Sequence, residues 1–146
     1  MMQTFALAPS GTRPVSFVAF VLVIVAVALF VTLAAMHGGR FEVSSGGLGI
    51  RGDLWGRFIE ARHLRTGAAR RVDFAAEPDL LPGWRTMGTG LPGYSSGWFR
   101  LRNGERALVY LTDRSRVVYI PTDAGYSLVL SPDDPDAFLA AIRALR

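Results

Sequence analysis

The stretch from Val15 to Met36 constrains this chain most, because it contains no ionisable residue in 22 positions. At about 1.5 Å per residue, a helix of this length measures roughly 33 Å, enough to cross a hydrocarbon core of about 30 Å. Pro14 suits a first helical turn, and Gly38 and Gly39 mark the far end. The pattern predicts one transmembrane helix over residues 15–36, whose apolar surface includes Val15, Phe20, Val25, Phe30 and Met36.

Two alternatives compete with a permanent membrane anchor. A cleaved signal peptide has an apolar core of about 7 to 15 residues and a small-x-small cleavage site, whereas this core is longer and Leu33-Ala34-Ala35-Met36 is a poor site. A buried helix of a soluble protein rarely stays apolar on all faces over this length. The sequence therefore favours the anchor, with a short tail at residues 1–14 and one small domain at residues 41–146.

Missing residue types exclude several kinds of chemistry. Without cysteine, the chain has no disulfide, thiolate metal site or cysteine nucleophile, and the absence of lysine excludes a Walker-type phosphate loop and a Schiff base. His37 and His63 have no neighbour at metal-ligand spacing. The net charge of +4 comes from dispersed arginines accompanied by acidic residues. We therefore expect no metal, no cofactor and no nucleic-acid partner.

Alternating residues and turn signals predict a domain built mainly from β-strands. Residues 41–52 form two short runs around a glycine turn, which indicates a hairpin. Residues 57–64 suggest another strand, and residues 66–81 a loop with a short strand or helical turn. Asn103-Gly104 joins strands at 98–102 and 105–112, because both turn positions accept positive φ. Further strands are expected at 116–121 and 126–130, giving an antiparallel meander.

The end of the chain predicts an amphipathic helix at residues 134–145. Asp133 and Asp134 precede Pro135, which suits a first helical turn. Phe138, Leu139 and Ile142 then share one helical face. The neighbouring aspartates lack the ligand spacing of a calcium loop, so a helix cap is favoured over a metal site.

Residues 85–145 resemble a known family of bacterial domains. The segment contains GTGLPGY, then GWFRLRNG, and ends in LSPDDPDAF. These patterns are similar to those of the bacterial pleckstrin-homology-like (PH-like) domains found in short membrane-anchored proteins. The resemblance implies a two-sheet antiparallel β-barrel capped by a C-terminal helix. The resemblance implies no known ligand, and no site residue of the family can be assigned to this sequence. The first hairpin turn, Ser45-Gly46-Gly47, lacks the basic residues of phosphoinositide-binding relatives.

Two stretches are candidate binding sites. The first is an arginine-rich segment suited to an anionic surface, where each arginine contributes about 1 kcal/mol; its members are Arg57, Arg62, Arg65, Arg70 and Arg71. The second is a glycine-rich loop at residues 85–97, whose backbone amides and aromatic rings suit a peptide or an anion; its members are Arg85, Gly88, Gly90, Gly93, Tyr94 and Trp98. Each stretch also has an alternative without a binding role. The arginine-rich segment can be a solvated loop, and the glycines of residues 85–97 can serve only to turn a corner of the barrel.

No arrangement of nucleophile and base is recognisable, so the sequence predicts a protein that is not an enzyme. The expected function is that of a membrane-anchored binding or scaffolding module, which engages a protein partner or the anionic bilayer surface. The alternatives are an accessory subunit of a membrane complex without its own ligand and, remotely, an unrecognised hydrolase. Arg13 lies before the predicted span and Arg40 and Arg51 after it. We expect a single-pass protein of the cell membrane with a cytoplasmic C-terminal domain, because the arginine-rich segment suits the anionic leaflet.

Overall fold

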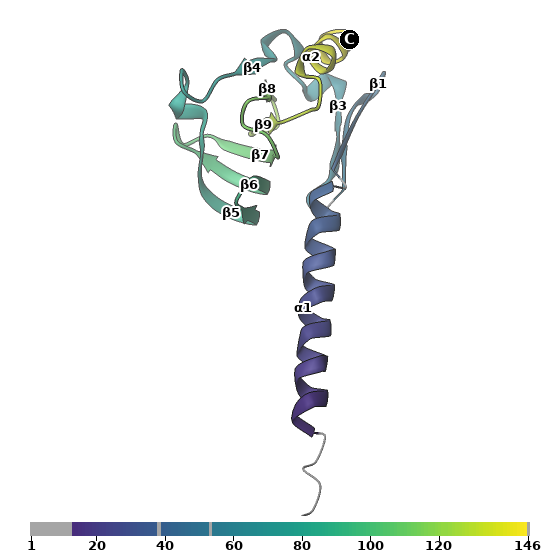
Figure 1. Cartoon of the computed structure of the whole chain (residues 1–146). Helices are drawn as coiled ribbons and strands as arrows, with labels where there is room; N and C mark the ends of the chain where they lie inside the picture. The colour runs from purple at the N-terminus through teal and green to yellow at the C-terminus, as the bar shows by residue number, and fades with distance from the viewer. Residues whose placement is uncertain (1–12, 38, 53, 146) are drawn as a thin grey trace, which may run out of the picture. The chain divides into compact units, whose positions relative to one another are not determined.

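The computed structural model describes residues 13–37, 39–52 and 54–145 (Figure 1). Residues 1–34 and 35–146 form two compact units, and each is described by itself. The predicted tail at residues 1–14 lies almost entirely outside the described residues. The C-terminal unit contains all of the strands and the second helix.

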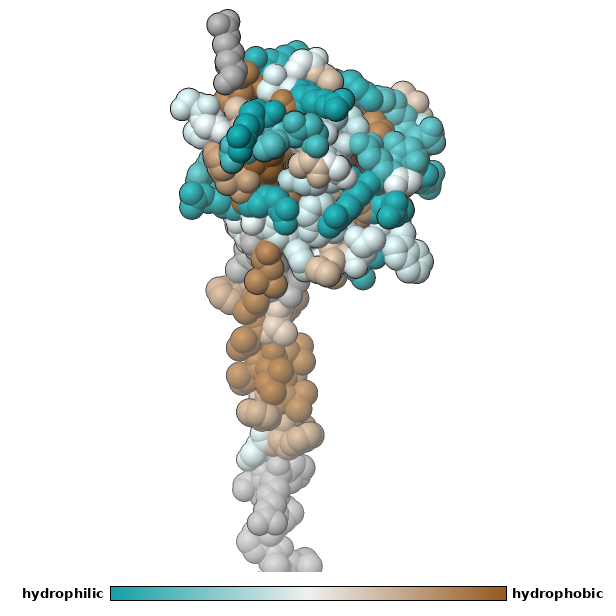
Figure 2. Space-filling view, turned by 180° about the vertical axis from the view of Figure 1, so that it is seen from behind, coloured by the Kyte–Doolittle hydropathy of each residue, from teal (hydrophilic) through white to brown (hydrophobic). Residues whose placement is uncertain are grey.

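Helix α1 spans Arg13–His37. Its large apolar side chains are exposed, including Phe20 at 63 %, Val25 at 56 % and Phe30 at 72 %, and Figure 2 shows hydrophobic residues along its visible face. The side chains of Val15 and Met36 lie outside the described residues. A membrane-crossing helix needs about 20 consecutive apolar residues, and in the described chain no helix meets the length and apolarity of a span. This corrects the prediction of a transmembrane helix over residues 15–36: the segment is helical, but a span is not supported.

The first sheet of the C-terminal unit has the order β1-β2-β3. Its strands are β1 (Arg40–Ser44), β2 (Gly47–Arg51) and β3 (Arg57–Glu60), paired antiparallel. The predicted hairpin at residues 41–52 is thereby confirmed. Gly47 has a φ of +146°, and a Cβ atom there would lie 2.1 Å from the Ile59 carbonyl oxygen. Glycine therefore allows β2 and β3 to approach closely at the turn.

The second sheet has the order β4-β8-β9-β7-β6-β5. Its strands are β4 (Arg70–Val72), β5 (Pro82–Leu91), β6 (Tyr94–Leu101), β7 (Arg106–Leu111), β8 (Val117–Pro121) and β9 (Ser127–Leu130). Short 3₁₀ turns at Ala61–His63, Thr66–Ala68 and Pro78–Leu80 complete the connections. The hairpin around Asn103-Gly104 is confirmed, because β6 and β7 pair antiparallel.

The predicted antiparallel barrel is wrong in two respects. Strand β9 lies between β7 and β8 and pairs in parallel with β7, so the sheet is mixed rather than a simple meander. The described strands form two open sheets instead of a closed barrel. Residues 85–97, predicted as a loop, instead lie in the paired strands β5 and β6. Gly88 and Gly97 allow β5 and β6 to pair closely, whereas the sequence suggested either a ligand-binding loop or a barrel corner turned by glycines.

Both faces of the second sheet are covered by apolar side chains. On one face, Leu108, Leu128 and Ile120 join Leu48 and Ile50 of the first sheet in one buried cluster. We call this the inner face. On the other face, Phe99 and Val109 pack with Phe74 and Leu80, which precede β5. The segment at residues 73–81, which had no clear period in the sequence, thus covers the outer face.

Helix α2 spans Pro135–Arg143, close to the predicted 134–145. Phe138, Leu139 and Ile142 are 9 %, 5 % and 0 % exposed, and all three belong to the inner-face cluster, as predicted. The Asp134 carboxylate accepts hydrogen bonds from the amides of Asp136 and Ala137, at 3.1 and 3.0 Å. It therefore caps the helix, as its position in the sequence indicated.

Replacing Asp134 with alanine is expected to lower the free energy of unfolding by about 1 kcal/mol, because two amides of α2 lose their acceptor. Urea denaturation of the full chain measures the change. Asp133→Ala is the matched control, since only the backbone carbonyl of Asp133 makes a hydrogen bond in the described structure, from Arg116. Equal losses in the two variants would contradict the capping role.

Candidate ligand-binding site

A pocket of about 780 Å³ lies in the C-terminal unit, where β1 begins beside β6, β7 and α2. We call it the corner pocket. Four aromatic residues from four different elements line it: Phe41, Tyr94, Tyr110 and Phe138. The Phe41 ring lies 6.3 Å from that of Tyr110 and 5.8 Å from that of Phe138, measured between ring centroids. Residues distant in the sequence thus build one aromatic wall.

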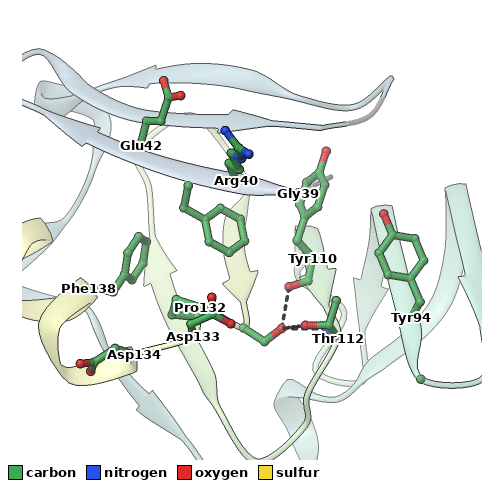
Figure 3. Close-up of a pocket in the computed structure, with 13 residues that line it drawn as sticks. Gly39, Arg40, Glu42, Tyr94, Tyr110, Thr112, Pro132, Asp133, Asp134 and Phe138 are labelled. Carbon is green, nitrogen blue, oxygen red and sulfur yellow. Dashed lines mark hydrogen bonds between the residues drawn. The ribbon is translucent and has the colours of Figure 1, made fainter. Parts of the chain in front are cut away.

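The polar groups near the floor of this pocket are mostly engaged with each other (Figure 3). The Ser131 hydroxyl lies 3.1 Å from the Thr112 hydroxyl and accepts a hydrogen bond from the Thr112 amide at 2.8 Å. The Asp134 carboxylate is occupied as the cap of α2. Arg40 and Glu42 line the side of the pocket that belongs to β1. The floor therefore offers few free polar groups, and the pocket suits a ligand with apolar parts.

Tyr94 differs from these polar neighbours. It is 7 % exposed and lines the corner pocket, and Figure 3 shows its ring extending in the same direction as that of Tyr110. Within the described residues its hydroxyl makes no hydrogen bond. The hydroxyl of a buried tyrosine usually has a hydrogen-bond partner, which a ligand or water can supply here. This tyrosine thus gives the pocket one specific polar contact for a bound group.

The arginine-rich segment does not form one patch. Arg62 pairs with Glu60 at 2.8 Å and Arg71 with Asp136 at 3.2 Å. Arg70 makes two hydrogen bonds to Glu77, at 2.5 and 2.6 Å. These bonds raise the pKa of Arg70 and lower that of the Glu77 carboxyl. Three of the five arginines thus already face a carboxylate, which weakens their attraction for an anionic surface.

The two remaining members of that segment form no salt bridge with a described carboxylate. Arg65 is exposed and follows the first 3₁₀ turn. Arg57 begins β3, and its guanidinium lies 4.7 Å from the Trp98 ring centroid. Arg70 lies over Tyr119 instead, at 5.5 Å. Arg57, Arg62, Arg70 and Arg71 therefore each have a different partner.

The glycine-rich segment contributes to two different places. Gly93 and Tyr94 line the corner pocket, at the turn between β5 and β6. Trp98 lies on the inner face, beneath Arg57 and 5.0 Å from the Tyr126 ring. Gly88, Gly93 and Gly97 have positive φ, whereas Gly90 lies beside the Arg85 guanidinium. The sequence did not predict that Phe41, Tyr110 and Phe138 line the pocket, since only the fold brings these residues together.

A network on the outer face fixes the hairpin of β6 and β7. Glu105 accepts hydrogen bonds from Tyr119, at 3.0 Å, and from Ser127. Burial raises the pKa of the Tyr119 hydroxyl, which the Glu105 hydrogen bond raises further, while the bond from Ser127 opposes the shift. The network is internally satisfied, so it supports the fold rather than a ligand site. In the described residues no group of histidine, aspartate and glutamate side chains is arranged to hold a metal ion.

A family model described as "Bacterial PH domain" matches residues 72–145, just over half of the chain. The chain therefore belongs to the bacterial PH domain family, which confirms the resemblance seen in residues 85–145. No curated protein and no solved structure matches the chain.

Proposed function

We propose that this protein is a non-enzymatic binding module, which holds a segment of a protein partner in the corner pocket. The observation that carries the proposal is the aromatic lining of that pocket together with Tyr94, a buried residue whose hydroxyl makes no hydrogen bond within the described residues. Aromatic walls with a few placed polar groups are typical of binding sites. An apolar side chain of the partner would fill the pocket, and a backbone carbonyl of the partner would accept the Tyr94 hydrogen bond.

Strand β1 adds a second reason to favour a protein segment. It is an edge strand, paired only with β2 among the described strands, and its residues 40–42 line the pocket. An edge strand presents unpaired N–H and C=O groups, to which an extended peptide can add. The pocket and the strand edge together supply side-chain and main-chain recognition.

The chemistry of the pocket supports binding rather than catalysis. Its lining contains no histidine, cysteine or lysine. The hydroxyls of Thr112 and Ser131 are hydrogen-bonded to each other, and neither donates a hydrogen bond to a described carboxylate or histidine that could act as a general base. An activated nucleophile needs such a base or a lowered pKa. The paired state of Arg62, Arg70 and Arg71 likewise favours a protein partner over the anionic surface that the sequence suggested.

Site-specific photo-crosslinking tests this proposal. The full chain carries benzoylphenylalanine in place of Arg40, at the pocket, or in place of Arg65 as the matched control. Both arginines are exposed, and neither side chain makes a hydrogen bond or ion pair in the described structure. We expect irradiation of living host cells to give one discrete protein adduct from position 40 and none from position 65.

Adding Tyr94→Phe to the position-40 chain should weaken that adduct at least threefold, because the variant removes only the hydroxyl. Adducts of equal strength from both positions would contradict the proposal. So would an adduct from position 40 that Tyr94→Phe leaves unchanged, or the absence of any adduct. Thermal denaturation shows whether each variant is folded.

A further inference from the structure

The inner face of the second sheet is incompletely covered at its β5 end. Directly opposite residues of antiparallel strands share a face, and the register pairs Trp84 with Arg100, Met87 with Trp98, and Arg100 with Arg106. Trp98 belongs to the inner-face cluster, so all of these residues lie on the inner face. Trp84 is 79 % exposed and Met87 57 %. Two large apolar side chains are therefore left open to solvent beside a row of arginines.

The arginines on this surface have no acidic partners in the described structure. Arg57 and Arg106 both lie over the Trp98 ring, at 4.7 and 4.2 Å from its centroid. Arg100 donates one hydrogen bond to the Gly104 carbonyl oxygen, at 2.8 Å. None of the three forms a salt bridge with a described carboxylate, in contrast to Arg62, Arg70 and Arg71.

Stacking on the Trp98 ring positions the guanidinium groups of Arg57 and Arg106 without occupying their N–H hydrogen-bond donors. A guanidinium has five N–H donors in its plane, and a ring beneath it leaves the edge of that plane available. Two cations near one ring repel each other, and an anionic group bound at their exposed edges lowers that repulsion. The surface is therefore complementary to carboxylates flanked by apolar groups.

The unpaired edge of strand β5 indicates which kind of ligand would carry the carboxylates. It is the last strand of the sheet order, so the edge away from β6 has no described strand beside it. From Met87 to Leu91 its pairing with β6 is regular, whereas bulges interrupt the earlier part. A row of unpaired main-chain groups is matched by another extended peptide. Lipid headgroups and nucleic acids lack the repeating amides to satisfy it.

We propose that β5 and the arginines around Trp98 form a second docking surface, which takes an extended acidic segment of a protein partner as an added strand. The corner pocket includes none of Trp84, Met87, Arg57, Arg100 or Arg106. This inference therefore goes beyond the proposed function and does not depend on it. Main-chain hydrogen bonds to β5 hold the segment, Trp84 and Met87 contact its apolar side chains, and the arginines bind its carboxylates.

Selection of random decapeptides displayed on phage, against the immobilised full chain, tests this docking surface. We expect the selected peptides to be enriched in aspartate or glutamate at alternate positions. Fluorescence anisotropy then measures the affinity of one selected peptide for variants of the full chain. Arg106→Gln should weaken binding at least tenfold and Trp84→Ala at least fivefold. The matched control Arg65→Gln should change it less than twofold.

Strand addition has its own signature. In an added strand, alternate amides face β5 and the others face away. N-methylation of one alternate set in the peptide should abolish binding, and methylation of the other set should leave it within threefold. Trp84→Ala keeps the test informative if Arg106→Gln unfolds, because Trp84 is largely exposed.

Three results would overturn the proposal. The first is a selection without acidic preference, and the second is equal binding by Arg106→Gln and Arg65→Gln. The third is tighter, Arg106-dependent binding of phosphatidylglycerol vesicles or of a dT20 oligonucleotide, which would assign the surface to lipid or nucleic acid. A failed cross-link at position 40 leaves this proposal standing, since the two surfaces share no residue.

Discussion

Replacement of Ile142 by alanine is expected to lower the free energy of unfolding by about 2 to 5 kcal/mol, the range measured for truncating fully buried large aliphatic residues. Ile142 is 0 % exposed and lies in the cluster that joins α2 to both sheets. Its removal leaves a cavity where three elements meet, so the surrounding side chains cannot all close around it. Urea denaturation of the full chain, followed by the tryptophan fluorescence of the domain, measures the loss.

Leu54→Ala is the control for this substitution. Leu54 is 93 % exposed, so its truncation should change the free energy of unfolding by less than about 0.5 kcal/mol. A loss below about 1 kcal/mol for Ile142→Ala would show that α2 does not pack against the sheets as described.

Replacement of Gly88 by alanine is expected to lower the free energy of unfolding by at least about 2 kcal/mol, from backbone strain and a steric clash. Gly88 has a φ of +144°, and a Cβ atom there would lie 2.2 Å from the Ser96 carbonyl oxygen. Its cross-strand neighbour Gly97 has a φ of +115° and a corresponding distance of 2.5 Å to the Met87 carbonyl oxygen. The two glycines let the backbones of β5 and β6 approach closely, and any side chain forces them apart.

Gly67→Ala is the matched control, because no atom lies within 4 Å of a Cβ atom placed there. This change should be neutral or stabilise the protein by up to about 1 kcal/mol, since alanine reduces the entropy of the unfolded chain. Thermal and urea denaturation of both variants compare the effects. Equal effects at Gly88 and Gly67 would contradict the close approach of β5 and β6.

Elements defined by local signals were predictable from the sequence. Asn103-Gly104 marks the position of its hairpin, although only Gly104 has a positive φ, +86°, because the turn is longer than the two-residue type expected. Asp134 and Pro135 mark the start of α2, and the spacing of Phe138, Leu139 and Ile142 gives its buried face. These features depend on neighbours a few residues apart in the chain.

Non-local pairings were not predictable in the same way. The insertion of β9 between β7 and β8 depends on which apolar strands fit together in space, and a parallel pair has no turn signal. The alternation of β5 is interrupted by bulges and glycines, so its sequence is typical of a loop although it pairs with β6 along its length. The transmembrane prediction depended on apolarity alone.

The candidate sites were also only partly predictable, because they depend on contacts between residues that are distant in the sequence. The sequence placed Arg57, Arg70 and Arg71 in one segment, but neighbouring residues of a strand point to opposite faces. Arg70 thus reaches Glu77 and Arg71 reaches Asp136. Tyr94 was found from its place beside the glycines, whereas Phe41, Tyr110 and Phe138 join it only through the fold.

Hydrogen exchange measured by mass spectrometry tests the central claim, that the corner pocket is where the protein binds its partner. The full chain is compared alone and in complex with the partner identified by cross-linking at position 40. We expect slower exchange of the amides at residues 39–44 and 94–96, because the bound segment covers β1 and the start of β6. Protection confined to residues 57–71, with the pocket amides unchanged, would contradict it.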